Sequence, residues 1–475
     1  MSSLATVLEE IVEGRKRHLD EIRQRVAHVD FDTLPKSERS LYDNLKRPGT
    51  SFILECKSSS PSLGTIREHY EPGEIAAVYS RSRNLAAGIS VLCEPDRFGG
   101  DYDHLATVAA TTHLPVLCKD FIIDEVQVYA ARYYGADAIL LMLSVLDDAT
   151  YTRLSALAGS LGMDVLTEII DEEEAERAAR LGAKIFGVNH RNLHDLSIDL
   201  SRSARLAAHA PADAAVVSES GIRTVETVRQ LGAHSDGFLV GSQLTSQPDV
   251  DLAVRELVYG PNKVCGLTSR TAAQAAKAAG AVYGGLIFED GSPRNVSRET
   301  ARDIIDHELG LRYVAVSRRS EGYGALLIDG IVAVQVHAPY QGSAEAERAL
   351  LERVRDEVDG RAEVWRAVSM TAPEGPETAN FLAEAGLADR LVLDSGQGGT
   401  GEAFDWATVS DTVKHHSLLA GGIGPENIEA ALRVGCLGVD LNSGVEYPAT
   451  AGEWAGKKDA GALRNVFRTI GNFHY

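Results

Sequence analysis

Short apolar runs rich in β-branched residues recur along the chain and alternate with longer segments of helical pattern. Strands spaced by roughly 20–35 residues with helices between them indicate βαβ units, and therefore parallel strands. Eight such units close a (β/α)8 barrel. The strands expected in the first half are residues 52–56, 89–93, 115–118, 138–143, 165–167, 185–188, 215–217 and 237–240.

The second half repeats this rhythm, with expected strands at residues 263–267, 284–288, 313–316, 333–337, 364–368, 390–394, 418–421 and 438–441. Tyr-Gly-Pro-Asn at 259–262 breaks a helix just before a new strand begins. The pattern predicts an α/β protein with two consecutive (β/α)8 TIM barrels, over residues 1–258 and 261–475. The length of 475 residues suits two barrels of about 200–250 residues each.

Residues 1–47 precede the first expected strand and form an N-terminal extension. Leu4, Val7, Leu8, Ile11 and Val12 give this extension a helical apolar stripe. We expect the helix to pack over one barrel mouth rather than to bind a partner.

The balance of charge limits the possible partners. The formal net charge of −21 and a pI near 5.1 disfavour nucleic acid and anionic membranes. An anionic metabolite stays possible, because local lysines and backbone N–H groups can hold a phosphate. The chain has no apolar signal segment and no run of membrane-spanning length, so we expect a cytoplasmic protein.

The five cysteines are scattered and show no CxxC or Cys/His metal spacing. This pattern predicts neither a disulfide framework nor a zinc site, and it fits a reducing compartment. No cofactor is implied.

Polar residues gather where the expected strands of the first half end, which is where a parallel barrel places its active site. A single residue of this kind is most often a solvated strand end, whereas a whole set in register around the barrel predicts catalysis. The set is Glu55, Lys57, Lys119, Asp120, Glu168, Asn189, Arg191, Glu219 and Ser220. Two small-residue turns, Ser218–Ile222 and Phe238–Ser242, follow strands seven and eight and can expose N–H groups to a phosphate.

Five motifs of the first half, in this order, resemble indole-3-glycerol-phosphate synthase over roughly the first 255 residues. They are Phe-Ile-Leu-Glu-Cys-Lys-Ser-Ser-Ser-Pro-Ser at 52–62, Leu-Cys-Lys-Asp-Phe-Ile-Ile-Asp at 117–124, Leu-Thr-Glu at 166–168, Gly-Val-Asn-His-Arg-Asn-Leu at 187–193 and Ser-Glu-Ser-Gly-Ile at 218–222. The resemblance implies a metal-free ring closure of 1-(2-carboxyphenylamino)-1-deoxyribulose 5-phosphate to indole-3-glycerol phosphate, with loss of CO2 and water.

The resemblance also implies roles for the residues. Lys119 would be the general acid and Glu168 the acid/base partner, while Lys57 would pair with anionic groups of the substrate and could move a proton. Glu55 and Asn189 would hold sugar hydroxyls, and Arg191 and Glu219 would order the charged shell. The remaining expected contacts are phosphate-binding Ser220, Gly221, Gly241 and Ser242, and Ser60 and Pro61 in the first loop.

In the second half, Cys265 lies near the end of the first expected strand and Asp394 at the end of the sixth. Taken alone, Cys265 would most often be buried filler, and Asp394 a turn former or helix cap. Small residues again follow strands seven and eight, in Leu-Ala-Gly-Gly-Ile at 419–423 and Leu-Asn-Ser-Gly-Val-Glu at 441–446.

This combination resembles phosphoribosylanthranilate isomerase over roughly residues 261–475. The resemblance implies an Amadori rearrangement of N-(5-phosphoribosyl)anthranilate, with Asp394 as general acid and Cys265, as thiolate, as base. Arg294 would bind the anthranilate carboxylate, and the phosphate would lie on Gly421, Gly422, Ser443 and Gly444. The sequence departs from the family pattern at Ala338, Arg366 and Ser317, which puts substrate affinity in question more than the reaction.

Two other interpretations stay open. The second barrel could be a catalytically idle docking or stabilising domain, although it retains Cys265, Arg294 and Asp394 together. It could also be a different phosphosugar isomerase, because a fold alone does not fix function. The expected partners are small phosphorylated anthranilate–ribose substrates, and a chain with two barrels is expected to be a monomer.

Overall fold

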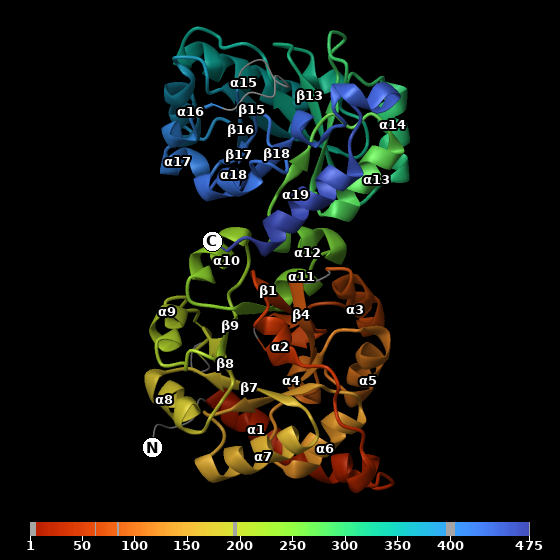
Figure 1. The fold of residues 1–475 in the computed structure, drawn as a ribbon, viewed down its shortest axis with the longest axis vertical. Helices are drawn as coiled ribbons and strands as arrows, with labels where there is room; N and C mark the ends of the chain where they lie inside the picture. Colours follow the sequence, from red (N-terminus) through yellow and green to blue (C-terminus); the bar gives the residue numbers. More distant parts are fainter. Residues whose placement is uncertain (1–5, 62, 83–84, 193–196, 396–403, 475) are drawn as a thin grey trace. The chain divides into compact units, whose positions relative to one another are not determined.

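The computed structural model describes residues 6–61, 63–82, 85–192, 197–395 and 404–474. The chain forms two compact units, the first running to Val254 and the second from Arg255 to Phe473. Each unit contains a closed barrel of eight parallel strands with helices around it (Figure 1). The prediction of two consecutive TIM barrels is confirmed.

The first barrel closes where β1 (Ser51–Cys56) pairs with both β10 (Gly237–Val240) and β4 (Ala86–Leu92). Every residue of these three strands is buried, because a parallel barrel covers its strands on both faces. This burial explains the apolar runs of the sequence. The other strands are β5 (Val116–Lys119), β6 (Ala138–Met142), β7 (Asp164–Ile169), β8 (Ile185–Asn189) and β9 (Ala215–Glu219).

Helix α8 (Glu172–Arg180) illustrates how the sequence sets helix ends in this barrel. The Asp171 side chain accepts a hydrogen bond from the backbone N–H of Glu174, and three glutamates occupy the positive first turn. Gly182 then takes a φ of 77° just after the helix. The other helices of this unit are α2 (Leu41–Leu45), α3 (Pro72–Ser80), α4 (Pro95–Phe98), α5 (Tyr102–Thr111), α6 (Glu125–Tyr133), α7 (Asp148–Ser160), α9 (Arg202–Ala207), α10 (Val225–Gly232), α11 (Ser242–Thr245) and α12 (Val250–Tyr259), which extends into the second unit.

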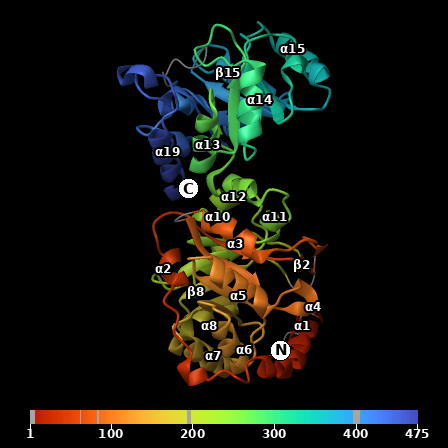
Figure 2. The ribbon, with the colours of Figure 1, turned by 90° about the vertical axis from the view of Figure 1, so that its right-hand side faces the viewer.

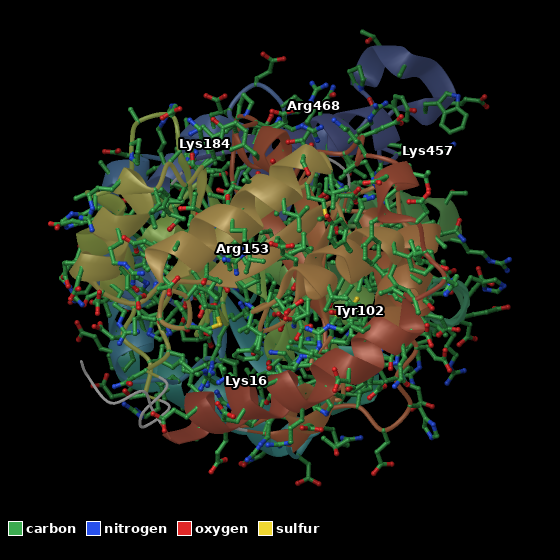
Figure 3. The ribbon with its side chains drawn as sticks, turned by 90° about the horizontal axis from the view of Figure 1, so that it is seen from below. Lys16, Tyr102, Arg153, Lys184, Lys457 and Arg468 are labelled. Carbon is green, nitrogen blue, oxygen red and sulfur yellow. The ribbon has the colours of Figure 1, made fainter. Side chains whose placement is uncertain are left out.

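The N-terminal helix α1 (Thr6–Arg25) packs near α4 and α6 (Figure 2). Lys16 of this helix is exposed to solvent, and it is labelled on α1 in Figure 3. On its buried side, Arg15 forms an ion pair with Asp120 at 2.5 Å. Val7, Leu8 and Ile11 line the cavity at the barrel mouth, which confirms the predicted packing for these residues. Leu4 lies outside the described residues.

The second barrel runs in strict chain order and closes where β11 (Lys263–Val264) pairs with β18 (Gly438–Leu441). Strand β11 is shorter than the expected 263–267, because Gly266 turns the chain with a φ of 69°. Cys265 therefore lies just beyond the strand. The remaining strands are β12 (Tyr283–Ile287), β13 (Arg312–Ser317), β14 (Ile331–Val336), β15 (Glu363–Ser369), β16 (Arg390–Asp394) and β17 (Ser417–Leu419).

The longer helices around this barrel bury apolar residues in the core of the unit. Leu350, Leu351 and Val354 of α15 (Ala344–Val358), for example, are fully buried in the core of the unit. The other helices are α13 (Arg270–Ala279), α14 (Arg298–His307), α16 (Gly375–Glu384), α17 (Asp411–Lys414), α18 (Ile428–Val434) and α19 (Ala460–Asn472). Throughout the described ranges, each helix is too short or too polar to cross a bilayer.

Candidate active sites

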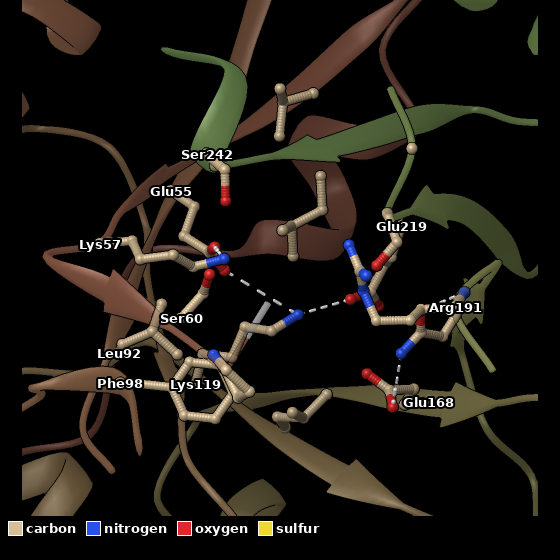
Figure 4. Close-up of a pocket in the computed structure, with 18 of the residues that line it drawn as sticks. Glu55, Lys57, Ser60, Leu92, Phe98, Lys119, Glu168, Arg191, Glu219 and Ser242 are labelled. Atoms are coloured by element: carbon tan, nitrogen blue, oxygen red, sulfur yellow. Dashed lines mark hydrogen bonds and ion pairs between the residues drawn. The ribbon is translucent and has the colours of Figure 1, made fainter. Parts of the chain in front are cut away.

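A cavity of about 490 Å³ lies at the carboxyl ends of the strands of the first barrel (Figure 4). It brings together all of the site residues predicted for this half. They are Glu55, Lys57, Ser60, Pro61, Lys119, Glu168, Asn189, Arg191, Glu219, Ser220, Gly221, Gly241 and Ser242.

Lys119, the last residue of β5, extends among carboxylates. Its Nζ lies 2.6 Å from Glu219 Oε2 and 4.0 Å from Glu55 Oε2 (Figure 4). Burial would lower the pKa of Lys119, but the charges of Glu219, Glu55 and Glu168 raise it above the ordinary value. The ammonium therefore keeps its proton at neutral pH.

Glu168, near the end of β7, is in a different electrostatic setting. Burial, followed by the charge of Glu219, raises its pKa to about 7, although Lys119 and the Asn189 side chain oppose this rise. Asn189 Nδ2 donates to Glu168 Oε1 at 3.2 Å. Glu168 therefore takes either protonation state near neutral pH.

Glu55 is a further charged group of the cavity, with its Oε1 2.6 Å from Lys57 Nζ. Burial would raise the pKa of Glu55, but Lys57 and Lys119 hold it below the ordinary value. Space for this carboxylate depends on Gly241, since a Cβ there would lie 2.2 Å from Glu55 Oε1. The glycine of this strand end therefore serves the charged cluster as well as the expected phosphate turn.

The turn after β9 has a left-handed backbone conformation. Ser220 has a φ of 67° and Gly221 a φ of 78°, and Ser220 is one of the few residues other than glycine with positive φ in the described chain. Gly241 and Ser242 follow β10 at the start of α11. All four residues line the cavity, so both predicted small-residue turns lie at the same mouth.

Sequence reasoning missed part of the cavity wall. Arg223 lines it as a further cation, and Leu92, Phe98, Leu140 and Met142 belong to its apolar side. Nothing in the sequence separates these apolar residues from ordinary core residues. Arg223 follows the Ser-Glu-Ser-Gly-Ile motif directly, and that position was the only available signal.

The second barrel carries a cavity of about 260 Å³, again at the strand carboxyl ends. Of the residues predicted for this half, it brings together Cys265, Arg294, Asp394, Gly421, Gly422 and Ser443. Gly444 does not line it. A Cβ at Gly444 would lie 2.2 Å from the carbonyl oxygen of Ile423, so close backbone packing explains this glycine.

Cys265 and Asp394 lie in environments that favour their protonated forms. Burial raises the pKa of the Cys265 thiol, although Lys263 and Lys458 oppose this rise. Burial also raises the pKa of Asp394 to about 6, against a hydrogen bond that its Oδ1 accepts from the Ser395 backbone N–H at 2.7 Å. The protonated Asp394 is consistent with the expected role of general acid. Cys265 requires nearby positive charge to form the thiolate.

Arg294 is held by a carboxylate that sequence reasoning did not single out. Its Nε and Nη2 donate to the two carboxylate oxygens of Glu446, at 2.7 and 2.8 Å. Lys458 Nζ donates to the same Glu446, at 2.6 Å. The guanidinium of Arg294 is thereby fixed at the cavity wall in one orientation.

The departures from the family pattern have different structural settings. Arg366 does not line the cavity. Its guanidinium pairs with Glu347 and donates to the carbonyl oxygens of Val336 and Ala338, so it anchors the loop after β14. Ser317 does line the cavity, and its Oγ accepts from Arg319 Nε at 3.0 Å.

Further residues of this cavity escaped prediction, among them Glu289, Arg318, His337 and Asp440. His337 Nε2 lies 3.7 Å from Asp394 Oδ2, and burial, with Arg366, lowers the pKa of His337 to about 4. Among the residues that the structure describes, no group of three or more His, Cys, Asp or Glu side chains could hold a metal ion.

Each barrel thus presents proton-donating and proton-accepting side chains, with a small-residue turn, at the carboxyl ends of its strands. This arrangement defines a TIM-barrel enzyme with two sites of acid–base chemistry on one chain.

Comparison with known proteins identifies the family. Residues 8–257 match the family model of indole-3-glycerol phosphate synthase, and residues 262–469 that of N-(5'-phosphoribosyl)anthranilate isomerase. The tryptophan biosynthesis protein TrpCF of Corynebacterium glutamicum is 70% identical over 100% of this chain and 99% of its own length. Those of Yersinia pestis and Salmonella typhi are 43% and 42% identical, over 98% of this chain and 94% and 99% of their own lengths. The chain belongs to this family of bifunctional tryptophan biosynthesis enzymes.

Proposed function

We propose that residues 1–258 form the synthase, which closes the indole ring of 1-(2-carboxyphenylamino)-1-deoxyribulose 5-phosphate. Lys119 acts as the general acid and protonates the ribulose carbonyl oxygen as the anthranilate ring carbon attacks the carbonyl carbon. Its protonated state among Glu219, Glu55 and Glu168 supports this role. CO2 then leaves the attacking ring carbon, and the electron pair of the broken bond restores the aromatic benzene ring. Loss of the hydroxyl as water, with a proton from the neighbouring carbon, completes the indole.

Glu168 is the acid/base partner of these later steps. A group with a pKa of about 7 can accept a proton and return it at neutral pH, which the dehydration requires. This combination of a protonated Lys119 and a titratable Glu168 in one cavity carries the proposal for the synthase.

The other residues of the cavity bind the substrate. Glu55 and Asn189 accept and donate hydrogen bonds with the sugar hydroxyls, and Lys57 pairs with anionic groups of the substrate. Arg191 and Glu219 order the charged shell. The phosphate binds to Ser220, Gly221, Gly241 and Ser242, and Ser60 and Pro61 border the substrate from the first loop.

Residues 261–475 form the isomerase. Asp394 donates a proton to the ribose ring oxygen of N-(5-phosphoribosyl)anthranilate, and the bond from that oxygen to C1 breaks as the nitrogen lone pair forms an iminium. Cys265 removes the proton from C2, and the resulting enolamine becomes the ketone as C1 gains a proton and the C2 hydroxyl loses one. The raised pKa of Asp394, about 6, supports its role as acid.

Arg294 binds the anthranilate carboxylate, while Gly421, Gly422, Ser443 and Gly444 form the phosphate-binding turns. Four of these five residues line the same cavity as Cys265 and Asp394, which supports the assignment. Gly444 contributes through its backbone, in the turn that Ser443 begins. The product of the isomerase is then the substrate of the synthase.

Two variants test these assignments separately. In Lys119→Met, we expect synthase turnover to be lost and isomerase turnover to stay unchanged. In Cys265→Ala, we expect isomerase turnover to be lost and synthase turnover to stay unchanged. The controls are Lys184→Met, at an exposed ion pair, and Cys436→Ala, at a buried cysteine of the second barrel. Retention of isomerase turnover in Cys265→Ala would support the idle-barrel or other-isomerase alternatives. We also propose a cytoplasmic monomer, which light scattering and fractionation would check.

A further inference from the structure

A buried ion pair lies beneath the isomerase cavity and has no part in the proposed chemistry. Lys263 and Asp440 face each other across the closure of the barrel, as register partners on β11 and β18. Lys263 is 0% exposed, and its Nζ donates to Asp440 Oδ2 and, at 2.9 Å, to Gln335 Oε1. A charged pair inside a barrel core costs desolvation energy, and its contribution to stability is often no better than that of apolar residues.

The ammonium end of this pair lies at the proposed base. Lys263 and Cys265 are two residues apart, and the Lys263 ammonium interacts electrostatically with the Cys265 thiol as well as with Asp440. Both pack against Gly285, since a Cβ there would lie 2.7 Å from Cys265 Sγ and 3.0 Å from Lys263 Cε. The absence of a side chain at Gly285 therefore leaves room for both residues.

The carboxylate end of the pair reaches the cavity, and Lys263 does not. Asp440 lines the cavity together with Cys265 and Asp394, and is 7% exposed. Its Oδ1 is buried and has no hydrogen-bond partner among the described residues. An unpaired buried carboxylate oxygen is costly, so its position at a substrate cavity points to use there.

The two ends of the pair act on the two proposed catalytic groups in opposite directions. At Cys265, Lys263 lowers the thiol pKa more than Asp440 raises it. At Asp394, Asp440 raises the carboxyl pKa more than Lys263 lowers it. The pair thus favours a deprotonated base and a protonated acid, which are the states that the reaction needs.

Other charged groups near the two catalytic residues do not replace this pair. Lys458 also lowers the pKa of Cys265, but its ammonium donates to Glu446 and to Asn442. The Arg294 guanidinium, which also interacts electrostatically with Cys265, is held by the same Glu446. On the other side, His337 lies 3.7 Å from Asp394 and is neutral at neutral pH, because burial lowers its pKa to about 4.

We propose that the Lys263–Asp440 pair is a positioning element of the isomerase that favours the thiolate at its base and the protonated carboxyl at its acid. Lys263 stabilises the Cys265 thiolate. Asp440 holds the ammonium, keeps the proton on Asp394, and offers its second oxygen to a hydroxyl of the substrate ribose. This inference rests on the proposed roles of Cys265 and Asp394. It assigns a function to two further residues, Lys263 and Asp440.

The test is the pH dependence of Cys265 alkylation by iodoacetamide, measured by mass spectrometry on the full chain. The double variant Lys263→Met/Asp440→Asn removes both charges at similar volume, so the barrel should still fold. We expect the midpoint of alkylation to move up by at least one pH unit, and kcat/KM of the isomerase to fall by at least tenfold. Cys265→Ala identifies the signal of this residue among the five cysteines.

A folded double variant with an unchanged midpoint and kcat/KM within twofold of the wild type would overturn the proposal. If the double variant does not fold, Lys263→Gln serves in its place, because an amide keeps hydrogen bonds to Gln335 and Asp440 without the charge. The alkylation midpoint and the isomerase kcat/KM of this variant then support or overturn the proposal by the same criteria. Alkylation does not depend on turnover. A shifted midpoint in a protein whose Cys265→Ala variant stays active would therefore refute the proposed base and leave the electrostatic role of Lys263 standing.

Discussion

Replacing Glu168 with glutamine should stabilise the first barrel at alkaline pH while it abolishes synthase activity. The rise of the Glu168 pKa from 4.5 to about 7 corresponds to about 3 kcal/mol, at 1.36 kcal/mol per pKa unit. A carboxyl whose folded-state pKa lies above its unfolded value binds its proton more tightly when folded. Stability therefore falls as the pH rises from about 4.5 to about 7, and that cost stays above pH 7.

Glutamine carries no charge, so Glu168→Gln should lose this part of the pH dependence. The difference in unfolding free energy between pH 5 and pH 8 should change relative to the wild type by up to about 3 kcal/mol. All three tryptophans lie in the second barrel, at 365, 406 and 454, so their fluorescence does not report on the first. Urea-dependent hydrogen exchange of peptides from residues 51–240, read by mass spectrometry, measures the first barrel, and tryptophan fluorescence serves as the internal reference.

The matched control is Glu173→Gln, which neutralises an exposed glutamate of the same barrel. This variant should keep the pH dependence of the wild type. The reasoning is refuted if Glu168→Gln shows the same difference between pH 5 and pH 8 as the wild type. It is also refuted if Glu173→Gln produces the change that is expected only for Glu168.

Two further predictions concern packing around the sites. Glu347→Gln leaves the buried Arg366 guanidinium without its counter-charge and should destabilise the second barrel by about 3–5 kcal/mol. The loss is measured as a lower urea midpoint of tryptophan fluorescence. The control, Glu352→Gln at an exposed glutamate, should leave that midpoint unchanged. Gly241→Ala places a methyl group against the Glu55 carboxylate and should lower synthase kcat/KM by about 100-fold, while isomerase turnover stays intact. A synthase rate within twofold of the wild type would contradict the argument for Gly241.

The positions of the strands and of the polar residues at their ends could be predicted because both follow simple periodicities. Parallel strands buried on both faces leave apolar runs in the sequence, and the carboxyl ends of all strands meet at one mouth. The charged cluster of Lys119, Glu168 and Glu219 follows from this rule alone. Their separate protonation states do not, because these depend on distances across the barrel.

Other features depend on contacts between distant residues. The ion pair of Arg15 with Asp120, which ties α1 to the barrel, joins positions 105 residues apart. The hairpin of β2 (Ser59–Ser60) and β3 (Gly64–Thr65) is too short to leave a periodic pattern. The pair of Lys263 and Asp440 did leave a signal, since two opposite charges stood inside the first and last expected strands of the second barrel.

The central claim is that one chain carries two independent sites that act in succession. The most direct test mixes the Lys119→Met and Cys265→Ala variants and supplies freshly generated N-(5-phosphoribosyl)anthranilate. We predict that Lys119→Met alone accumulates the carboxyphenylamino-deoxyribulose phosphate, that Cys265→Ala alone leaves the substrate unchanged, and that the mixture forms indole-3-glycerol phosphate. Formation of indole-3-glycerol phosphate by either variant alone, or its absence from the mixture, would contradict the account.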